Sequence, residues 1–252
     1  MNNSTVITFL TKFPNLDLIS FAEKLSDYYK IFIFIDDNSY DIIKNEKINF
    51  IQIDNNECME NGFIYTEESF ISNDYNKKLI SSWDKCLYYF TCINFDYDYL
   101  WIIEDDVFIP SVEAFNKINE KSNNNDLITA ANKKATFEDA KNNIWHWSYA
   151  FMIFNEETYC YCSMVCCCRL SKRLLLEIKK IIKKNNLVPL NEFLFNTTAM
   201  KNNFSVYNPI ELSSIVFRQD WKIEDFKENP NNLYHPVKDY NNHNKYRSLI
   251  HS

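Results

Sequence analysis

The sequence predicts an α/β protein in which a mostly parallel central sheet is flanked by helices, with a smaller antiparallel portion in the second half. Two observations predict this class. Four segments are apolar almost without interruption, as strands buried on both faces are. Between them lie segments whose apolar residues recur at helical spacing, and this alternation of strand and helix is typical of parallel sheets.

The first half of the chain supplies the clearest elements. The four apolar segments, expected as buried strands, are residues 5–10, 30–35, 48–53 and 99–103. Helices are expected over residues 14–28 and 76–93, where apolar side chains form one stripe, and Trp83 belongs to the second stripe. These elements are those of a sheet covered on both sides.

The second half is less regular. Strands are expected over residues 126–131 and 147–154, the latter pairing antiparallel. Helices are expected after Ser171, which suits an N-cap, and over residues 190–201. No internal repeat and no linker divides the sequence, so we expect residues 1–252 to form one domain.

Glycine content excludes several classes of enzyme. Gly62 is the only glycine of the chain. Dinucleotide-binding, Walker A and kinase loops need several glycines, because their backbone approaches phosphate closely or adopts positive φ. The nucleophile elbow of serine hydrolases is absent for the same reason. Any bound phosphate must therefore be held by a metal, by side chains or by a helix N-terminus without glycine.

Charge and cysteine content limit the partners and the compartment. The net charge of −7 disfavours nucleic-acid binding, which needs a basic face. No apolar run approaches the roughly 20 residues of a transmembrane segment, and no signal peptide precedes the first strand. We therefore expect a cytoplasmic protein whose eight cysteines stay reduced. The five between residues 160 and 168 lack zinc-knuckle spacing, which favours buried structural cysteines over a metal site.

Carboxylates follow three of the four predicted strands. They are Asp36 and Asp37, Asp54, and the triplet Glu104-Asp105-Asp106. Ligands of open α/β sheets bind at the carboxyl ends of the strands, and converging carboxylates there are costly without a cation. Mg²⁺ and Mn²⁺ prefer carboxylate oxygens and commonly share their shell with phosphates. The sequence thus predicts a metal–diphosphate site, although a solvated turn residue is the favoured interpretation of Asp54.

Two motifs resemble those of a known family. Residues 35–39, Ile-Asp-Asp-Asn-Ser, are similar to the strand-end Asp-Asp-Gly-Ser of GT-A glycosyltransferases, and residues 101–107, Trp-Ile-Ile-Glu-Asp-Asp-Val, resemble their DxD motif. The sequence particularly resembles small glycosyltransferases of protists and large DNA viruses, over roughly residues 5–240. It departs from the pattern at Glu104, which replaces Asp, and at Asn38, which replaces Gly.

The resemblance implies a Rossmann-like GT-A domain. Residues 1–110 would form the nucleotide-sugar-binding half, residues 111–240 the acceptor-binding half, and residues 241–252 a tail. A nucleoside-diphosphate sugar would be the donor, with UDP-sugars preferred because uridine is the commonest choice in the family. A glycan or other hydroxyl compound would be the acceptor. If the protein is viral, its location would be the host cytoplasm.

Individual roles follow from the same resemblance. The expected ligands of Mn²⁺ or Mg²⁺ are Glu104, Asp106 and His235, the last in Tyr-His-Pro-Val-Lys. The expected donor contacts are Thr8, Asp36, Asp37, Lys85, Glu104, Asp105 and Lys238. Two bland alternatives remain open: His235 as a solvated side chain of a polar tail, and Lys85 as part of a solvated helix face.

Catalysis and acceptor binding have their own candidates. An inverting transfer needs a carboxylate base for the acceptor hydroxyl, and Glu192 is the first candidate and Asp220 the second. Either could instead be a helix cap or a surface charge, and a retaining transfer needs no such base. The run Trp145-His146-Trp147 suits stacking on a sugar face, or alternatively a place in the core.

Two other classes of function compete with the transferase. A metal-dependent phosphoesterase also clusters carboxylates at strand ends, but it normally uses more histidines than the four present here. A non-catalytic carbohydrate- or protein-binding module would fit the aromatic content of 16% and would leave the acidic strand ends without a purpose.

Overall fold

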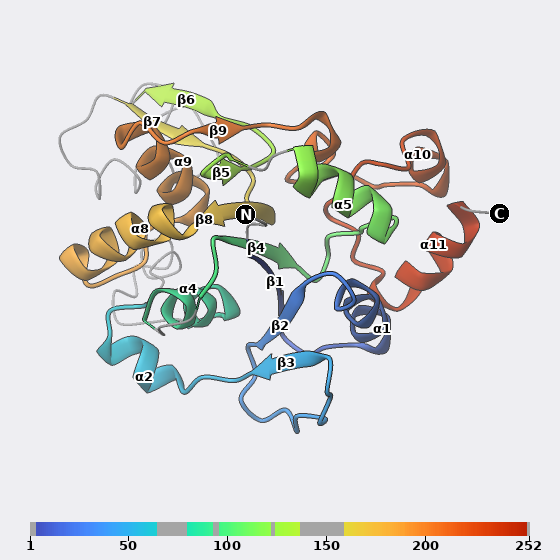
Figure 1. The fold of residues 1–252 in the computed structure, drawn as a ribbon, viewed down its shortest axis with the longest axis horizontal. Helices are drawn as coiled ribbons and strands as arrows, with labels where there is room; N and C mark the ends of the chain where they lie inside the picture. The colour runs from blue at the N-terminus through green and yellow to red at the C-terminus, as the bar shows by residue number, and fades with distance from the viewer. Residues whose placement is uncertain (1–3, 65–79, 93–95, 122–123, 137–158, 251–252) are drawn as a thin grey trace.

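The computed structural model describes residues 4–64, 80–92, 96–121, 124–136 and 159–250. Within these ranges the chain is a mixed α/β protein with helices on both sides of a central sheet (Figure 1). Its strands are β1 (Thr5–Thr11), β2 (Lys30–Ile35), β3 (Ile48–Ile51), β4 (Tyr99–Glu104), β5 (Leu127–Ile128), β6 (Lys133–Thr136), β7 (Tyr159–Cys162), β8 (Cys167–Ser171) and β9 (Val206–Tyr207).

Eight α-helices lie in the described part of the chain. They are α1 (Leu16–Leu25), α2 (Asn55–Glu60), α4 (Ser82–Cys92), α5 (Val112–Lys121), α8 (Lys172–Asn185), α9 (Asn191–Lys201), α10 (Ile223–Glu228) and α11 (His243–Ile250). Short 3₁₀ helices, η1 (Ile210–Leu212) and η2 (Tyr240–Asn242), complete the elements. None of the helices described is both long enough and apolar enough to span a membrane.

The seven-stranded sheet confirms the predicted class. Its order is β3-β2-β1-β4-β8-β5-β9. Strands β3, β2, β1 and β4 run parallel, and β9 runs parallel to β5. Strand β8 alone is antiparallel, to both β4 and β5, and a separate two-stranded antiparallel sheet pairs β6 with β7. The antiparallel portion therefore lies in the second half of the chain, as expected.

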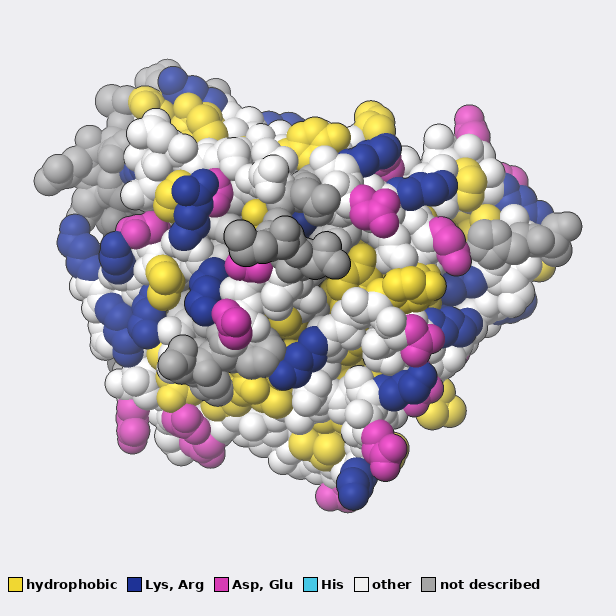
Figure 2. Space-filling model, viewed as in Figure 1, with side chains coloured by type: hydrophobic (Ala, Val, Ile, Leu, Met, Phe, Trp, Pro, Cys, Tyr) yellow, Lys and Arg dark blue, Asp and Glu magenta, His cyan; other side chains and the backbone are white. Residues whose placement is uncertain are grey.

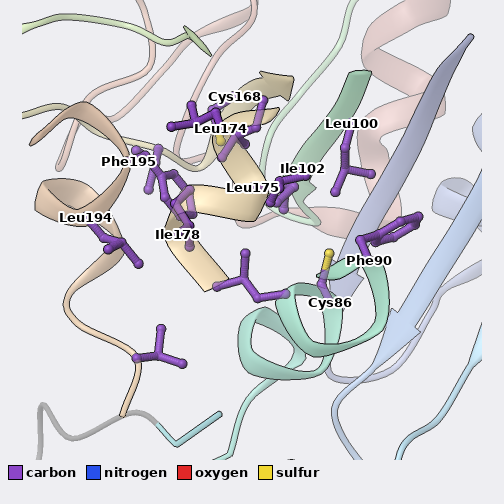
Figure 3. Packing of buried hydrophobic residues seen from close by; sticks show 14 of the residues in the cluster. Cys86, Phe90, Leu100, Ile102, Cys168, Leu174, Leu175, Ile178, Leu194 and Phe195 are labelled. Carbon is purple, nitrogen blue, oxygen red and sulfur yellow. The ribbon is translucent and has the colours of Figure 1, made fainter. Parts of the chain in front are cut away.

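The two faces of the sheet are covered by different helices. On one face Leu100 and Ile102 of β4 pack with residues of α4, α8 and α9, as Figure 3 shows around Phe90 and Leu174. On the other face Trp101 packs against α5, and the residues of α1 complete that layer. Successive strand residues thus point to opposite cores, which explains why these strands are apolar throughout.

Local signals set several helix ends. Asn15 caps α1 by accepting a hydrogen bond from the backbone N–H of Leu18 at 2.8 Å. Ser171 caps the start of α8, as predicted. The helix ends at Asn185, and the next residue, Asn186, is its C-cap, with a left-handed φ of 52°. Gly62 has a φ of +80°, and a side chain there would approach Asn186 within 2.7 Å. The single glycine therefore has a conformational role next to the end of α8.

Basic side chains gather over the outer surface of α8 (Figure 2). Two of them tie the helix to its neighbours on the same face of the sheet. Lys179 donates to the carbonyl oxygen of Thr91 in α4, and Lys183 donates to that of Asn61 beyond α2, each at 2.7 Å. These bonds help to fix α4, the helix that carries residues of the site described below.

Several expected elements differ from the structure in their bounds. Helix α1 ends at Leu25 rather than residue 28, and the strand expected over residues 126–131 keeps only Leu127 and Ile128 in its ladder. The strand expected over residues 147–154 lies outside the described residues. Strand β8 and helix α5 were not predicted at all.

The C-terminal residues pack on the first half of the chain. The tail expected from residue 241 contains helix α11, where the guanidinium of Arg247 lies 3.8 Å from the ring centre of Phe21. The same side chain donates to the carbonyl oxygen of Ile109 at 2.9 Å. Phe108 and Tyr234 form a small apolar cluster with Phe226 nearby. This packing holds the segment around Tyr234 against the end of β4.

Candidate metal centre

Three parallel strands end together at one edge of the sheet, and their ends are tied to one another. The backbone N–H of Asp36 donates to the carbonyl oxygen of Thr11 at 2.9 Å, and that of Asp105 donates to Leu10 at 3.0 Å. The hydroxyl of Thr11 donates to the carboxylate of Asp105 at 2.5 Å. The carboxyl ends of β2, β1 and β4 therefore form one continuous acidic edge, as the sequence predicts.

The segment after Asn232 brings a histidine to this edge. Tyr234 and Phe108 exchange two backbone hydrogen bonds, and the N–H of Val237 donates to the carbonyl oxygen of Asp106 at 2.8 Å. His235 lies between these contacts. Its Nε2 is 3.3 Å from Oδ1 of Asp106 and 3.8 Å from Oε2 of Glu104.

The orientation of His235 is fixed by its other ring nitrogen. Nδ1 lies 2.7 Å from the carbonyl oxygen of Val216, which can only accept, so Nδ1 carries the proton in this contact. The neutral ring then turns the lone pair of Nε2 toward Asp106 and Glu104. Burial opposes protonation, but hydrogen bonding and charge from Asp106 outweigh it and raise the pKa of His235. The side chain is only 8% exposed, so the solvated-tail alternative is wrong.

Glu104 is held from two sides. The indole N–H of Trp83 donates to its Oε1 at 2.7 Å. The thiol of Cys166 also forms a hydrogen bond with this carboxylate. Burial raises the pKa of Glu104, the charge of Asp106 adds to the effect, and the bond from Trp83 opposes it. The carboxylate is thus oriented by its neighbours before any ligand arrives.

Asp106 supplies the observation that favours a cation. Its Oδ1 is buried, and while the ring of His235 is neutral it receives no hydrogen bond from the described residues. A buried carboxylate oxygen without a donor is costly, and two carboxylates beside each other are costlier still. The donors Glu104, Asp106 and His235 are of the types that bind Mn²⁺. The types of these residues therefore fit a divalent cation, and the binding of Mn²⁺ or Mg²⁺ stays a prediction.

Asp105 points away from this cluster. Its carboxylate accepts from Thr11, and burial raises its pKa to about 6. In the structure it joins the ends of β1 and β4, and its expected contact with the donor stays a prediction. Tyr240 lies close enough to the acidic triplet for their charges to act on it, although burial is the main cause that raises its pKa.

Lys85 supports the end of β2 from inside the protein. Its Nζ donates to the carbonyl oxygen of Asp36 at 2.6 Å and to Oδ1 of Asn38 at 2.8 Å. The side chain is fully buried, so the alternative of a solvated helix face is wrong. Burial lowers the pKa of Lys85 and raises that of Asp36. Direct contact of Lys85 with a sugar stays a prediction.

The neighbouring Asp37 is arranged differently from Asp36. Its Oδ1 accepts from the N–H of Ser39 at 2.8 Å and from its hydroxyl at 2.6 Å, and these bonds lower the pKa of Asp37. Asp54 caps α2 by accepting from the backbone N–H of Asn56 at 2.8 Å, which agrees with a structural role.

Glu192 and Glu104 line the same pocket. It has a volume of about 240 Å³, and its walls include Trp83, Cys166 and Asn191. Glu192 is partly exposed in the first turn of α9, where its carboxylate can meet a ligand in the pocket. The structure therefore brings the first candidate for the catalytic base into the same pocket as Glu104.

Asp220 and Lys238 lie in a different hollow from Glu192. Both line an open hollow of about 870 Å³, together with Trp221. The indole N–H of Trp221 donates to the carbonyl oxygen of His235 at 3.0 Å, which joins this hollow to the centre. Asp220 pairs with Lys222 at 2.7 Å and is 86% exposed, as expected of a surface charge.

Thr8 is misplaced for a donor contact. It lies in the middle of β1, pairs with Phe32 and Ile102, and has no exposed surface. Thr11, three residues later at the end of the strand, occupies the position that faces the acidic edge. The prediction of a donor contact for Thr8 is therefore wrong, because its side chain is enclosed in the middle of the sheet, away from the carboxyl end of the strand.

The remaining expected site residues have two outcomes. Trp145, His146 and Trp147 lie outside the described residues, so their contact with an acceptor stays a prediction. The cysteines between residues 160 and 168 are buried and reduced, as expected, but one of them, Cys166, adjoins the metal centre.

No protein-family model matches the chain, and no curated protein matches it either. The geometry of the centre therefore carries the functional argument, and the resemblance to GT-A glycosyltransferases stays a prediction.

The structure adds residues that the sequence pattern did not single out. Trp83 was expected only as part of an apolar stripe, yet its indole N–H binds Glu104. Thr11 and Cys166 were not expected in the site. The place of Thr11 at the end of a predicted strand could have indicated that it belongs to the site. The place of Cys166 could not, because it depends on the antiparallel pairing of β8 with β4.

Proposed function

We propose that this protein is a metal-dependent glycosyltransferase that moves a sugar from a nucleoside-diphosphate sugar to a glycan or other hydroxyl acceptor. One observation carries the proposal. Glu104, Asp106 and the lone pair of His235 converge at the carboxyl edge of the parallel strands, beside Asp36 and Asp37. An edge of this kind is where α/β sheets bind nucleotides, and glycine loops that would hold phosphate without a metal are absent.

The residues of the centre have distinct tasks in this proposal. Glu104, Asp106 and His235 would hold Mn²⁺ or Mg²⁺, which when bound neutralises negative charge on a leaving diphosphate. Asp36 and Asp37, at the end of β2, which β1 separates from β4, would accept hydrogen bonds from hydroxyls of the nucleoside. Uridine is the preferred base by the resemblance of residues 35–39 and 101–107.

Side chains outside the metal set would complete the reaction. In an inverting transfer, the carboxylate of Glu192 would take the proton of the acceptor hydroxyl as that oxygen bonds to the anomeric carbon and the bond from this carbon to the nucleoside diphosphate breaks. Its place in the pocket that Glu104 also lines supports this role over Asp220, which is exposed and paired with Lys222. Lys238, on the segment that follows His235, would contact the diphosphate.

Product analysis tests the proposed reaction. The full chain would be incubated with UDP- and GDP-sugars and simple saccharide acceptors, with Mn²⁺ or with a chelator. We expect release of the nucleoside diphosphate together with a glycosylated or hydrolysed sugar, in the presence of Mn²⁺ only. Asp106→Asn should abolish this release, and Asp27→Asn, which alters an exposed side chain paired with Lys47, should not.

Other products would identify the competing functions. Release of inorganic phosphate or a nucleoside monophosphate would indicate a phosphoesterase at the same metal centre. Absence of any turnover, with saccharide binding retained by a folded protein, would contradict the transferase and indicate a binding module.

A further inference from the structure

The metal centre contains a sulfur donor that a site for Mg²⁺ does not need. Donor atoms of Glu104, Cys166 and His235 all lie within 4.8 Å of one another. Cys166 directly precedes β8, and its carbonyl oxygen accepts from the backbone N–H of Glu104 at 2.8 Å. The antiparallel ladder between β4 and β8 therefore fixes the position of this cysteine beside the carboxylate.

The donor set is that of a softer cation than Mg²⁺. Mg²⁺ takes oxygen ligands in an octahedron, whereas Zn²⁺ binds sulfur, imidazole nitrogen and carboxylate oxygen in a tetrahedron. Zinc–ligand bonds of about 2.0–2.3 Å place tetrahedral donors roughly 3.3–3.8 Å apart. Nε2 of His235 lies 3.8 Å from Glu104 and 3.3 Å from Asp106, both within that range.

Two independent features show that the ligands are oriented in advance. Nδ1 of the buried His235 is fixed on the carbonyl oxygen of Val216, the kind of outer contact that histidine ligands make in metal sites. Oδ1 of Asp106, the nearest carboxylate oxygen to that ring, is buried, and while the ring is neutral it receives no hydrogen bond from the described residues. The carboxylate of Asp106 thus adjoins the ring of His235, next to the set of three donors.

We propose that Glu104, Cys166 and His235 bind one thiophilic divalent cation such as Zn²⁺ or Cd²⁺ in preference to Mg²⁺. The inference rests on the donor set and does not require the proposed transfer reaction. A sulfur–metal bond forms as the thiol of Cys166 loses its proton to solvent.

Cadmium titration tests the proposal directly. Cd²⁺ would be added to the metal-free full chain, and the ultraviolet charge-transfer band of cadmium thiolate would report bonds to sulfur. We expect one equivalent to bind wild type, and Cys166→Ser to lose the band and weaken Cd²⁺ binding by about tenfold or more. The control Cys92→Ser, which alters the exposed cysteine, should behave as wild type.

A second measurement covers the case in which Cys166→Ser does not fold. In wild type, one equivalent of Zn²⁺ should protect Cys166 from alkylation, as measured by mass spectrometry of its peptide. Mg²⁺ in large excess should not protect it. Equal alkylation with and without Zn²⁺, or a cadmium band that persists in Cys166→Ser, would overturn the proposal.

The outcome is separable from that of the proposed function. Binding of Cd²⁺ through Cys166 without any binding of nucleoside diphosphate would leave the metal site standing and contradict the transferase. Nucleotide binding that depends on Mn²⁺, with no Cd²⁺–sulfur band, would support the transferase and contradict the thiophilic metal site.

Discussion

Asp84→Asn should make the protein more stable at pH 8. Asp84 occupies the first turn of α4, where its Oδ2 accepts from both the N–H and the hydroxyl of Ser81 at 2.8 Å. The carboxylate is buried, and its Oδ1 has no hydrogen-bond partner among the described residues. Burial raises the pKa of Asp84 from its ordinary value of 3.8 to about 7.

The magnitude follows from proton linkage. The folded state binds more protons at Asp84 than the unfolded state between about pH 4 and pH 7, so stability falls as pH rises through that window. The full cost of the charged form at pH 8 is about 4 kcal/mol. The amide of Asn keeps an acceptor for Ser81 but leaves its N–H₂ unpaired, which costs about 1–3 kcal/mol. A net gain of about 1–3 kcal/mol remains.

Urea unfolding of wild type and variant between pH 5 and pH 8 measures this difference. The advantage of the variant should shrink by about 3 kcal/mol on going from pH 8 to pH 5, where the wild-type carboxyl is already protonated in the fold. Asp225→Asn is the matched control, because Asp225 accepts from the N–H of Lys222 at the start of α10 in the same way but near the surface. A constant difference across the pH range at position 84 would refute the reasoning.

Three further substitutions test other contacts of the site. Trp83→Phe removes the donor to Glu104 and should weaken Mn²⁺ binding, measured by electron paramagnetic resonance, by about tenfold or more; unchanged affinity would show that this bond is dispensable. Lys85→Met leaves two acceptors unpaired and should lower the free energy of unfolding by about 2 kcal/mol or more, whereas the exposed control Lys184→Met should change it by less than about 0.5 kcal/mol. Glu192→Gln should reduce transfer at least about a hundredfold while nucleotide binding persists, and full activity would remove it as the base.

Most strands and helices of the first half of the chain, which position the site, were predicted from the sequence. Strands β1, β2 and β4 are apolar on both faces, so their existence and their direction in a parallel sheet followed from composition. The carboxylates at their ends then had to meet at one edge, and the structure places Asp36, Asp105 and Asp106 there. Local patterns are informative here because the alternation of strands and helices indicates a parallel sheet, whose strands end at the same edge.

The second half was harder because its contacts are long-range. Strand β8, with Cys167 and Arg169, has neither a continuous apolar run nor clean alternation, and only pairing with β4 and β5 makes it a strand. Helix α5 has a narrow stripe, Val112, Phe115 and Ile118, that is easily missed in a polar segment. Cys166 enters the centre through that same pairing, which no local spacing encodes.

For His235, the sequence indicated the role of the residue but not the contacts that bury it. The resemblance of Tyr-His-Pro-Val-Lys indicated His235 as a ligand, although the segment looks like a polar tail in composition. Its burial depends on backbone pairing of Tyr234 with Phe108 and on the carbonyl of Val216, about 20 residues earlier in the chain. Contacts of this kind are visible only in the folded chain.

Calorimetric titration of UDP and GDP, with and without Mn²⁺, tests the central claim most directly. Wild type and Asp27→Asn should bind one of the two nucleotides tightly with Mn²⁺ and weakly without it, and Asp106→Asn should lose the Mn²⁺-dependent part. Three results would contradict a nucleoside diphosphate held by a metal at this edge of the sheet. They are nucleotide binding that is the same with and without Mn²⁺, Mn²⁺-dependent binding that is unchanged in Asp106→Asn, and no binding by a folded wild type.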